Sequence, residues 1–382
     1  MASFNSVCCV LLLLMINSRS YVAAQLAPVS VISSDGVIPN GNFEEAPNPS
    51  NLKKITIVGK YSLPKWVKRG LVRYVSGGHK RVGFTFNVSR DVHAVSLGQD
   101  ASILQYMRLK HWTYYSITFS ATRTCPLDKF IRITYGGGSA DFGFPSKTLY
   151  LSDKADTFAW GLRTATGTSY IHFSNPTGHP KYPACGPLIQ AVAIKELPPP
   201  PIMTTGNNLI HNGNFEIGPY TLENFTTGVY IHPYTLNPIS PLPGWIIESR
   251  YTIRYITSKD FFIPSGSSAV ELLVGGKTNA IAQVIGTTPK MYYNLTFTIG
   301  DANNGCIGSM EVQASADKET IKVKYESQGK GGVTHASLRF QAVSLSFTTR
   351  ISFWSVFYHN TIDDPNRFCG PVLDNVRVVL DQ

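Results

Sequence analysis

The sequence predicts an all-β protein built from two β-sandwich domains in tandem. The chain repeats itself, because Val37–Glu44 (VIPNGNFE) returns as Leu209–Glu216 (LIHNGNFE), and the tripeptide Cys-Gly-Pro at Cys185 returns at Cys369. Aromatic residues make up 12% of the chain, which also contains 32 Gly and 24 Pro. Frequent turn residues between short apolar stretches favour many short strands over helices. The repeat and the composition together predict one β-sandwich in each half.

The domain boundaries follow the repeat. Domain 1 is predicted over residues 35–197 and domain 2 over residues 208–381. Between them, residues 198–207 begin with four prolines, which cannot donate hydrogen bonds to a sheet and favour an extended polyproline II conformation. We therefore expect a stiff, proline-rich linker between two copies of one domain.

The predicted strands recur in the same order in both halves. In domain 1, Asn40-Gly41-Asn42 predicts a turn that leads into the first strand. Apolar and polar residues alternate over Tyr115–Ser120, which predicts a strand with one buried face, and Ile171–Phe173 lies in a later strand. In domain 2, Tyr293–Thr298 shows the same alternation, and Ile351–Phe353 matches the later strand.

The tryptophans divide into repeated and unrepeated ones. Trp66 and Trp245 each follow a Leu-Pro pair in equivalent places, so we expect them in the core or in a hairpin. Trp112 and Trp160 have no counterpart in the other half. Aromatic residues in a β protein usually pack in the core, and the alternative is that these two are platforms on which sugar rings stack.

Residues Met1–Ala24 are predicted to be a secretory signal peptide cleaved after Ala24. The apolar core, Val7–Ile16, is too short to span a bilayer, and no later stretch is long and apolar enough for a transmembrane helix. We therefore expect a secreted, extracellular protein that is not held in a membrane. The net charge of +10 favours acidic partners. Nucleic acid is not expected among them, because the protein is secreted and lacks a nucleic-acid-binding motif.

Four cysteines follow the signal peptide. Cys125 and Cys185 have nearly the same separation as Cys306 and Cys369. Four cysteines allow three pairings, and repeat symmetry favours Cys125–Cys185 and Cys306–Cys369. Zinc binding is the alternative, but it lacks support because the chain has no Cys-x-x-Cys motif and no neighbouring pair of histidines.

Seven stretches together resemble a known family. They are Val37–Glu44 (VIPNGNFE), Tyr61–Trp66 (YSLPKW), Thr118–Cys125 (TFSATRTC), Ala184–Leu197 (ACGPLIQAVAIKEL), Pro241–Trp245 (PLPGW), Gly300–Met310 (GDANNGCIGSM) and Cys369–Asp374 (CGPVLD). In this order they are similar to the plant cell-wall family called domain of unknown function 642. The resemblance covers nearly the whole chain after the signal peptide. It implies tandem galactose-binding-like jelly-roll domains, secretion to the cell wall, non-enzymatic association with polysaccharide, and modulation of pectin methylesterase.

A basic segment departs from the pattern of that family, which usually carries acidic residues after the tryptophan. Between Ala46 and Arg90 the chain has ten Lys and Arg residues and no Asp or Glu. Guanidinium groups suit carboxylates, so the segment is a candidate surface for demethylated pectin. The predicted polyanion-binding residues are Lys65, Lys68, Arg69, Arg73, Lys80 and Arg81. The alternative is a solvated surface that only keeps the protein soluble.

Two carboxylates in domain 2 are candidate ligands of a structural calcium ion. Asp374 is in phase with the apolar residues of the last strand, so it is expected to point inward, where an unpaired carboxylate is costly. Similar jelly-roll carbohydrate modules often join a last-strand Asp and a Glu in the place of Glu216 through Ca²⁺. The alternative is a hydrogen-bonded Asp374 without an ion. In domain 1, Glu44 is the corresponding candidate calcium ligand, and it would face Gln190, a neutral and weaker ligand. No other cofactor is expected.

Three sequons predict N-glycosylation, at Asn87, Asn224 and Asn294. Asn294 and Thr296 lie on the polar side of their predicted strand and should be accessible.

The sequence offers no catalytic motif, so we do not expect an enzyme. The first functional hypothesis is binding of wall polysaccharide, acidic pectin above all and cellulose as a second candidate, through the basic surface of domain 1. The second is a protein-interaction module that docks on pectin methylesterase and modulates it. A weak glycoside hydrolase is the third, because paired carboxylates need only meet in space.

Overall fold

The computed structural model describes residues 29–31, 35–81, 85–125, 130–136, 138–144, 155–165, 167–177, 183–199, 207–223, 225, 227–231, 239–248, 253–273, 281–343, 345, 347–356, 359–363 and 368–381. For residues 29–31, 76–81 and 85–92 it describes the backbone alone. The predicted signal peptide and residues 200–206 of the predicted linker lie outside these ranges. The regular secondary structure of the described chain consists of strands, apart from a 3-10 turn, η1 (Pro49–Asn51). It contains no helix that is long and apolar enough to cross a membrane.

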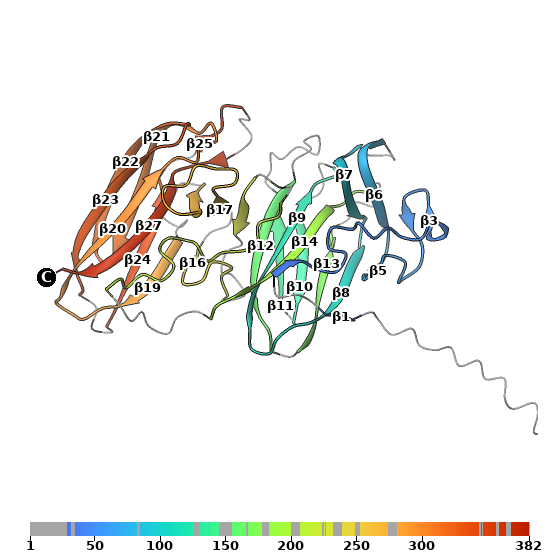
Figure 1. Cartoon of the computed structure of the whole chain (residues 1–382), viewed down its shortest axis with the longest axis horizontal. Coiled ribbons are helices and arrows are strands. Elements are labelled where there is room, and N and C mark those ends of the chain that lie inside the picture. Colours follow the sequence, from blue (N-terminus) through green and yellow to red (C-terminus); the bar gives the residue numbers. More distant parts are fainter. Residues whose placement is uncertain are drawn as a thin grey trace, which may run out of the picture.

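Domain 1 is a sandwich of two sheets (Figure 1). One sheet has the order β1-β8-β13-β10-β11, with β5 also paired to β8. Its strands are β1 (Val29–Val31), β5 (Val67–Arg69), β8 (Ser102–Arg108), β10 (Phe130–Tyr135), β11 (Gly138–Gly143) and β13 (Thr168–Ser174). The other sheet has the order β12-β9-β14-β7-β6-β4-β3, with β2 also paired to β14. Its strands are β2 (Asp35–Val37), β3 (Leu52–Lys53), β4 (Thr56–Ile57), β6 (Val72–Arg81), β7 (Thr85–Leu97), β9 (Tyr114–Thr122), β12 (Asp156–Arg163) and β14 (Leu188–Leu197).

Domain 2 repeats this architecture. One sheet has the order β16-β19-β24-β21-β22. Its strands are β16 (Ile246–Ile247), β19 (Ile281–Gly286), β21 (Ile307–Ala316), β22 (Glu319–Gln328) and β24 (Thr348–Ser355). The facing sheet has the order β23-β20-β27-β18-β17-β15. Its strands are β15 (Val229–Ile231), β17 (Ile253–Thr257), β18 (Ser268–Leu272), β20 (Tyr292–Gly300), β23 (Val333–Gln341) and β27 (Val372–Leu380), and a separate pair is β25 (His359–Asn360) with β26 (Phe368–Cys369). The predicted fold class, two tandem β-sandwiches, is confirmed.

The two cores are built on the same aromatic contacts. In domain 1, Phe173 packs against Trp66 at 6.2 Å and against Phe119 at 5.5 Å between ring centroids. In domain 2, Phe353 packs in the same way against Trp245 at 6.3 Å and Phe297 at 5.0 Å. Both repeated tryptophans are fully buried, as predicted. Burial of such large rings supplies much of the hydrophobic stabilisation of each sandwich.

The repeated Asn-Gly-Asn-Phe motif closes one end of each core. Asn40 and Asn212 adopt positive φ angles of 49° and 50°, which Asn tolerates better than most residues. Their side chains bond to the loop that precedes each tryptophan, at the carbonyls of Pro64 and Pro243. The indole N–H of each tryptophan donates to the backbone carbonyl of the Asn at 2.9 Å. This closed set of bonds explains why the motif and the tryptophan recur together.

The two domains share one continuous sheet. Strand β15 of domain 2 pairs in parallel with β12 of domain 1, with Thr157 opposite Val229 and Ala159 opposite Ile231. Strand β15 then pairs with β17 inside domain 2, so the hydrogen-bonded order runs from one sandwich into the other (Figure 1). The domains therefore touch directly, and the predicted linker does not hold them apart.

Docking of domain 2 changes the environment of β9. The predicted alternation placed Ser116, Thr118 and Ser120 on a solvent-facing side, but all three are fully buried. Their neighbouring strand β14 packs Ala191 and Ala193 against Leu222 of domain 2. The prediction of a single buried face is therefore wrong for β9, because the outer face of this sheet is covered by the second domain.

Candidate functional site

A groove at one end of domain 2 is the candidate binding site. It has a volume of about 570 Å³ and is open to solvent. Its lining combines amide, acidic, basic and apolar side chains: Asp260, Phe261, Asn303, Asn304, Ile307, Gln328, Lys330, Ile362 and Asp363, together with Gly305 and Gly329. Four segments far apart in the sequence meet here, and a groove with apolar walls and a few polar groups is typical of a ligand site.

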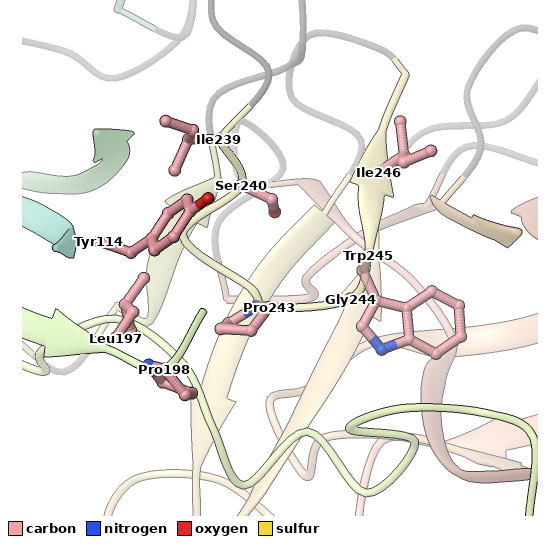
Figure 2. A pocket seen from close by; sticks show the side chains of 9 residues that line it. All are labelled: Tyr114, Leu197, Pro198, Ile239, Ser240, Pro243, Gly244, Trp245 and Ile246. Carbon is pink, nitrogen blue, oxygen red and sulfur yellow. The ribbon is translucent and has the colours of Figure 1, made fainter. Parts of the chain in front are cut away.

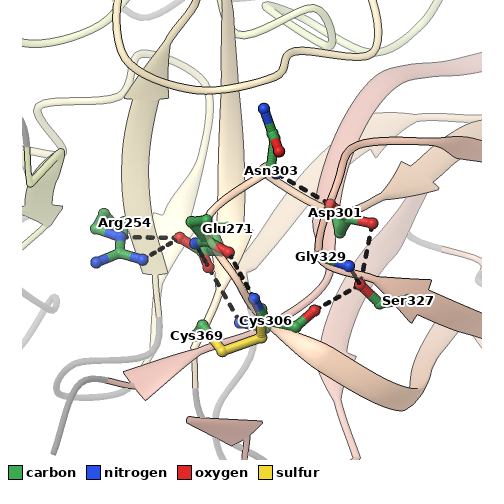
Figure 3. The surroundings of a disulfide bond; sticks show 10 residues. Arg254, Glu271, Asp301, Asn303, Cys306, Ser327, Gly329 and Cys369 are labelled. Atoms are coloured by element: carbon green, nitrogen blue, oxygen red, sulfur yellow. Dashed lines mark hydrogen bonds and ion pairs between the residues drawn. A yellow bond between two sulfur atoms is a disulfide. The ribbon is translucent and has the colours of Figure 1, made fainter. Parts of the chain in front are cut away.

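The Cys306–Cys369 disulfide fastens the central loop of the groove to the strand pair β25–β26. Figure 3 shows this bond beside Glu271 and below the loop that carries Asn303. The Cα atoms of the two cysteines lie 5.9 Å apart. The equivalent bond in domain 1 joins Cys125 to Cys185, with a Cα separation of 5.8 Å. Both pairings match those favoured by repeat symmetry.

A buried carboxylate holds two rims of the groove together (Figure 3). Asp301 is fully buried, and its Oδ1 accepts hydrogen bonds from the backbone N–H groups of Asn303 at 2.9 Å and Gly331 at 2.7 Å. Its Oδ2 accepts from the hydroxyls of Tyr325 and Ser327, both at 3.0 Å. Burial and, next, the bond to Asp301 raise the pKa of Tyr325 to about 12, so its hydroxyl remains a donor. Satisfied networks of this kind rigidify the loops they join.

A buried ion pair between Arg254 and Glu271 fixes one residue of the groove, Asn304. The guanidinium of Arg254 donates from Nε to Glu271 Oε2 at 2.8 Å, and neither side chain is exposed. Glu271 Oε1 accepts from Asn304 Nδ2 at 2.9 Å and from the backbone N–H of Gly370 at 3.1 Å. The amide of Asn304 is therefore fixed in orientation while part of its hydrogen-bonding capacity faces the groove. Asn303 and Gln328, by contrast, are exposed on the rim.

This arrangement suits recognition of neutral hydroxyl-bearing ligands. Amide side chains both donate and accept hydrogen bonds, as a sugar hydroxyl does. Phe261 and the apolar side chains of Ile307 and Ile362 supply surface for the non-polar face of a ring. The prediction from sequence did not single out these amides as a site, although the stretch Gly300–Met310 was recognised as characteristic. A pair of Asn residues between a strand end and a disulfide cysteine was the available signal.

The predicted basic residues are distributed over strands of both sheets and the turn before β5. Lys68 and Arg69 lie on β5, while Arg73 lies on β6 of the facing sheet. Lys65 and Arg69 are exposed; Lys68 and Arg73 are partly buried, which lowers the pKa of each side chain. In the described part of the chain, none of these four forms an ion pair. Lys80 and Arg81 belong to β6, but their side chains lie outside the described residues.

The predicted calcium ligands of domain 2, Glu216 and Asp374, both accept hydrogen bonds from the loop that contains Ser265 and Ser267. Asp374 is fully buried, and its Oδ2 accepts from the N–H of Ser265 at 2.8 Å. Glu216 Oε1 accepts from the N–H of Ser267 at 2.7 Å. Burial, with a further contribution from the charge of Glu216, raises the pKa of Asp374 from 3.8 to about 7. Free lone pairs on both carboxylates fit a hard cation, but no set of three His, Cys, Asp or Glu ligands occurs among the described residues. Backbone carbonyls would have to complete the shell, so calcium stays a prediction.

Domain 1 lacks this arrangement. Oε2 of Glu44, which is half exposed, lies 3.2 Å from Nδ1 of His93. Gln190 is buried where domain 2 has Asp374. The residues that domain 1 offers are a single exposed carboxylate and a neutral amide, which fit a calcium ion poorly.

Of the three predicted glycosylation sites, the structure describes the side chain of Asn294 alone. Asn294 is partly exposed on β20, as is Thr296, so this sequon is accessible. Asn224 lies outside the described residues. Asn87 belongs to β7, but its side chain is also outside the description. Glycosylation of all three stays a prediction.

The unrepeated tryptophans also differ. Trp160 is 4% exposed and lies in the core of domain 1, so it is a packing residue and the alternative of a stacking platform is excluded for it. Trp112 is 61% exposed at the turn between β8 and β9. Nearby, a second and smaller cleft of about 150 Å³ lies between the domains (Figure 2).

Solved structures with tandem or single β-sandwich domains align with this chain at low similarity. The tandem CBM22-1–CBM22-2 domain of Xyn10C from Paenibacillus barcinonensis covers 92% of this chain and 99% of its own, with 7% identity and a TM-score of 0.28. TmCBM61 in complex with β-1,4-galactotriose covers 46% of this chain and 100% of its own, with 13% identity and a TM-score of 0.29. The ANX2 ectodomain from Arabidopsis thaliana covers 93% and 96%, with 11% identity and a TM-score of 0.31.

Comparisons of the sequence with known proteins give much higher similarity than these structural alignments. Protein TEEBE of Arabidopsis thaliana is 44% identical over 371 residues, which cover 97% of this chain and 97% of the relative. Protein DUF642 L-GALACTONO-1,4-LACTONE-RESPONSIVE GENE 2 of the same plant is 43% identical over 360 residues, or 94% and 95% of the two chains. The profile of the family described as protein of unknown function (DUF642) matches residues 36–195 and 208–379. The chain belongs to the DUF642 family.

Proposed function

We propose that this protein is a secreted, non-catalytic component of the plant cell wall that binds wall polysaccharide, with the groove of domain 2 as one binding site. The observation that carries the proposal is the pair of exposed rim amides, Asn303 and Gln328, on loops fixed by a buried network and a disulfide. A site that is already ordered loses little entropy when a ligand binds. Disulfides fit the oxidising environment outside the cell.

The chemistry of the two domains supports different ligands. The groove of domain 2 has two carboxylates, Asp260 and Asp363, and one cation, Lys330, so it favours neutral chains such as cellulose. In domain 1, Lys68 and Arg69 have no acidic partner in the described part of the chain and attract polyanions. We propose that demethylated pectin binds the basic surface of domain 1.

Retention of the protein on insoluble polymers tests both sites. The secreted protein is applied to cellulose and to demethylated pectin at low and high salt. The double variant Asn303→Ala/Gln328→Ala should lose cellulose retention and keep pectin retention. The double variant Lys68→Glu/Arg69→Glu should lose most of its pectin retention, which in the native protein falls steeply with salt. Retention that is unchanged in both variants would refute the assignment of these sites.

A second candidate function is docking on pectin methylesterase. The observation that favours a protein surface is a group of exposed apolar side chains after β23, where Val343, Leu345 and Phe347 are 47%, 84% and 63% exposed. An apolar interface should resist salt, unlike the binding of pectin by lysines. Leu345→Ser should weaken capture of the esterase at both salt concentrations if this candidate is correct, whereas the charge variants of domain 1 should not.

Absence of catalysis is part of the proposal and has its own test. Asp260 and Asp363 are the carboxylates that line the groove. Prolonged incubation with soluble glucan and pectin should release no reducing ends. Release that disappears in Asp260→Asn or Asp363→Asn would make the protein a hydrolase.

A further inference from the structure

We propose that Trp112, Arg163 and Tyr114 form a third carbohydrate site, which binds a carboxylate-bearing sugar ring at the boundary of the two domains. The site is separate from the groove of domain 2 and from the basic surface of domain 1. The inference rests on the proposed function in one respect only, which is that the ligand is a carbohydrate.

The first step is the position of Trp112. Its ring is 61% exposed, although its backbone is held in a conformation with a φ of 51° that bulky residues rarely adopt. The turn is fixed by Thr164, which is fully buried and has a hydroxyl that lies 2.9 Å from the N–H of Thr113 and 2.5 Å from the carbonyl of Lys110. The N–H of Thr164 donates to the carbonyl of Thr113 at 3.0 Å. An exposed indole on a fixed turn is a preorganised stacking surface.

The second step is the guanidinium between two rings. Arg163 lies 5.0 Å from the ring centroid of Trp112 and 5.3 Å from that of Tyr114. Stacking orients the plane of a guanidinium and leaves the N–H groups at its edge available for a carboxylate. Arg163 is exposed and forms no ion pair with a described residue. The neighbouring carboxylate of Glu196 is engaged by Lys110 at 2.7 Å, which raises the pKa of that lysine.

The third step is the cleft beside Tyr114. Figure 2 shows Tyr114 and Leu197 of domain 1 and Pro198 of the linker lining this cleft together with Pro243 and Trp245 of domain 2. The walls are mostly apolar and suit the carbon face of a ring that projects past Tyr114. Because residues from both halves of the chain line it, the cleft exists only when the two domains are docked.

The ligand follows from these groups. An apolar cleft and an exposed indole contact the faces of a ring, and the free edge of Arg163 binds its carboxylate through two hydrogen bonds. A uronic acid residue has both features. Trp112 follows the C-terminal end of β8, whereas Arg69 is paired with Ser102 at its start, so the strand of roughly 20 Å separates this site from the basic surface.

Calorimetric titration with oligogalacturonate at low ionic strength tests the inference. The parent protein in this titration is the full secreted chain with Lys68→Glu/Arg69→Glu, because the basic surface of domain 1 would otherwise bind the same oligomer. Adding Arg163→Gln, which removes the bidentate contact, or Trp112→Ala, which removes the stacking surface, should weaken binding about tenfold. Arg377→Gln, which changes an exposed arginine on β27, is the matched control and should leave the affinity of the parent unchanged. The fully methyl-esterified oligomer, which has the same rings without charge, should bind the parent no better than the acid binds the parent with Arg163→Gln.

A fluorescence readout separates binding at this site from binding elsewhere. Oligogalacturonate should change the tryptophan emission of the native protein, and the change should be lost in Trp112→Phe. Equal affinity of the Lys68→Glu/Arg69→Glu parent with and without Arg163→Gln, equal affinity of this parent for the acid and its ester, or no binding of the oligomer to this parent would overturn the inference. Retention on cellulose through Asn303 and Gln328 would survive that result, so failure here is distinct from failure of the proposed function.

Discussion

The cores of the two domains are built from equivalent residues, but polar residues differ in the sheets that connect the domains. Arg254 on β17 stands opposite Glu271 on β18, and both are fully buried as an ion pair. In domain 1, Arg73 on β6 stands opposite Ser96 on β7 and is only partly buried. The repeat has therefore kept the arginine and changed its partner. Since Glu271 also orients Asn304 in the groove, this difference coincides with the presence of the binding site in domain 2.

The largest effect should come from breaking that pair. Arg254→Met leaves the carboxylate of Glu271 buried without its cation, which costs about 3–5 kcal/mol of unfolding free energy. Arg73→Met removes a charge that has no acidic partner among the described residues, and should change stability by less than about 1 kcal/mol. Denaturant unfolding of both variants measures the contrast. Equal losses would show that the buried pair does not distinguish the domains.

The last strand carries Asp374 in domain 2 and the neutral Gln190 in domain 1, and this difference predicts how the stability of the fold depends on pH. Asp374 has a pKa of about 7 in the fold against 3.8 ordinarily, so the folded state keeps a proton that the unfolded chain releases. Stability should then be complete below about pH 4 and fall as pH rises through 7, by at most about 1.4 kcal/mol per pH unit. With allowance for solvent screening, we expect a loss of about 2 kcal/mol between pH 5 and 7.

Thermal unfolding across this pH range, with and without calcium, measures the effect. Asp374→Asn should flatten the decline, because domain 1 already has the neutral Gln190 in that place. If calcium binds here, it should raise the melting temperature at pH 8 far more than at pH 5, since it binds the ionised carboxylate. An equal calcium effect in the native protein and in Asp374→Asn would rule out this ion site.

The shared sheet can be broken at a glycine. A Cβ at Gly161 on β12 would lie 2.2 Å from the carbonyl oxygen of Ile239, so Gly161→Ala forces the domains apart locally. We expect a loss of about 1.5 kcal/mol, and calorimetry should resolve two transitions where the native protein shows one. A glycine with open space around it, Gly286, provides the control, because Gly286→Ala adds no contact. One sharp transition in Gly161→Ala would indicate that the domains unfold together for another reason.

Sequence patterns predicted what depends on local periodicity. The inward phase of Asp374, the buried tryptophans Trp66 and Trp245, and the all-β fold follow from residues close together along the chain. Burial of Ser116 on β9 could not be predicted in this way, because it results from contact with a domain more than a hundred residues away. The groove was missed for the same reason, since it joins loops around Asp260, Asn303 and Gln328 that only the fold brings together.

The smallest expected effect tests whether binding depends on the order of the groove or on the overall stability of the protein. Tyr325→Phe removes the hydroxyl that donates to Asp301, and Tyr74→Phe removes one that donates to the carbonyl of Phe43 in domain 1. Each lost hydrogen bond should cost about 1 kcal/mol of unfolding free energy. Only Tyr325→Phe should also weaken cellulose retention, because Asp301 joins the two rims of the groove. If Tyr74→Phe weakens it equally, then general stability, and not the ordered rim of domain 2, determines binding.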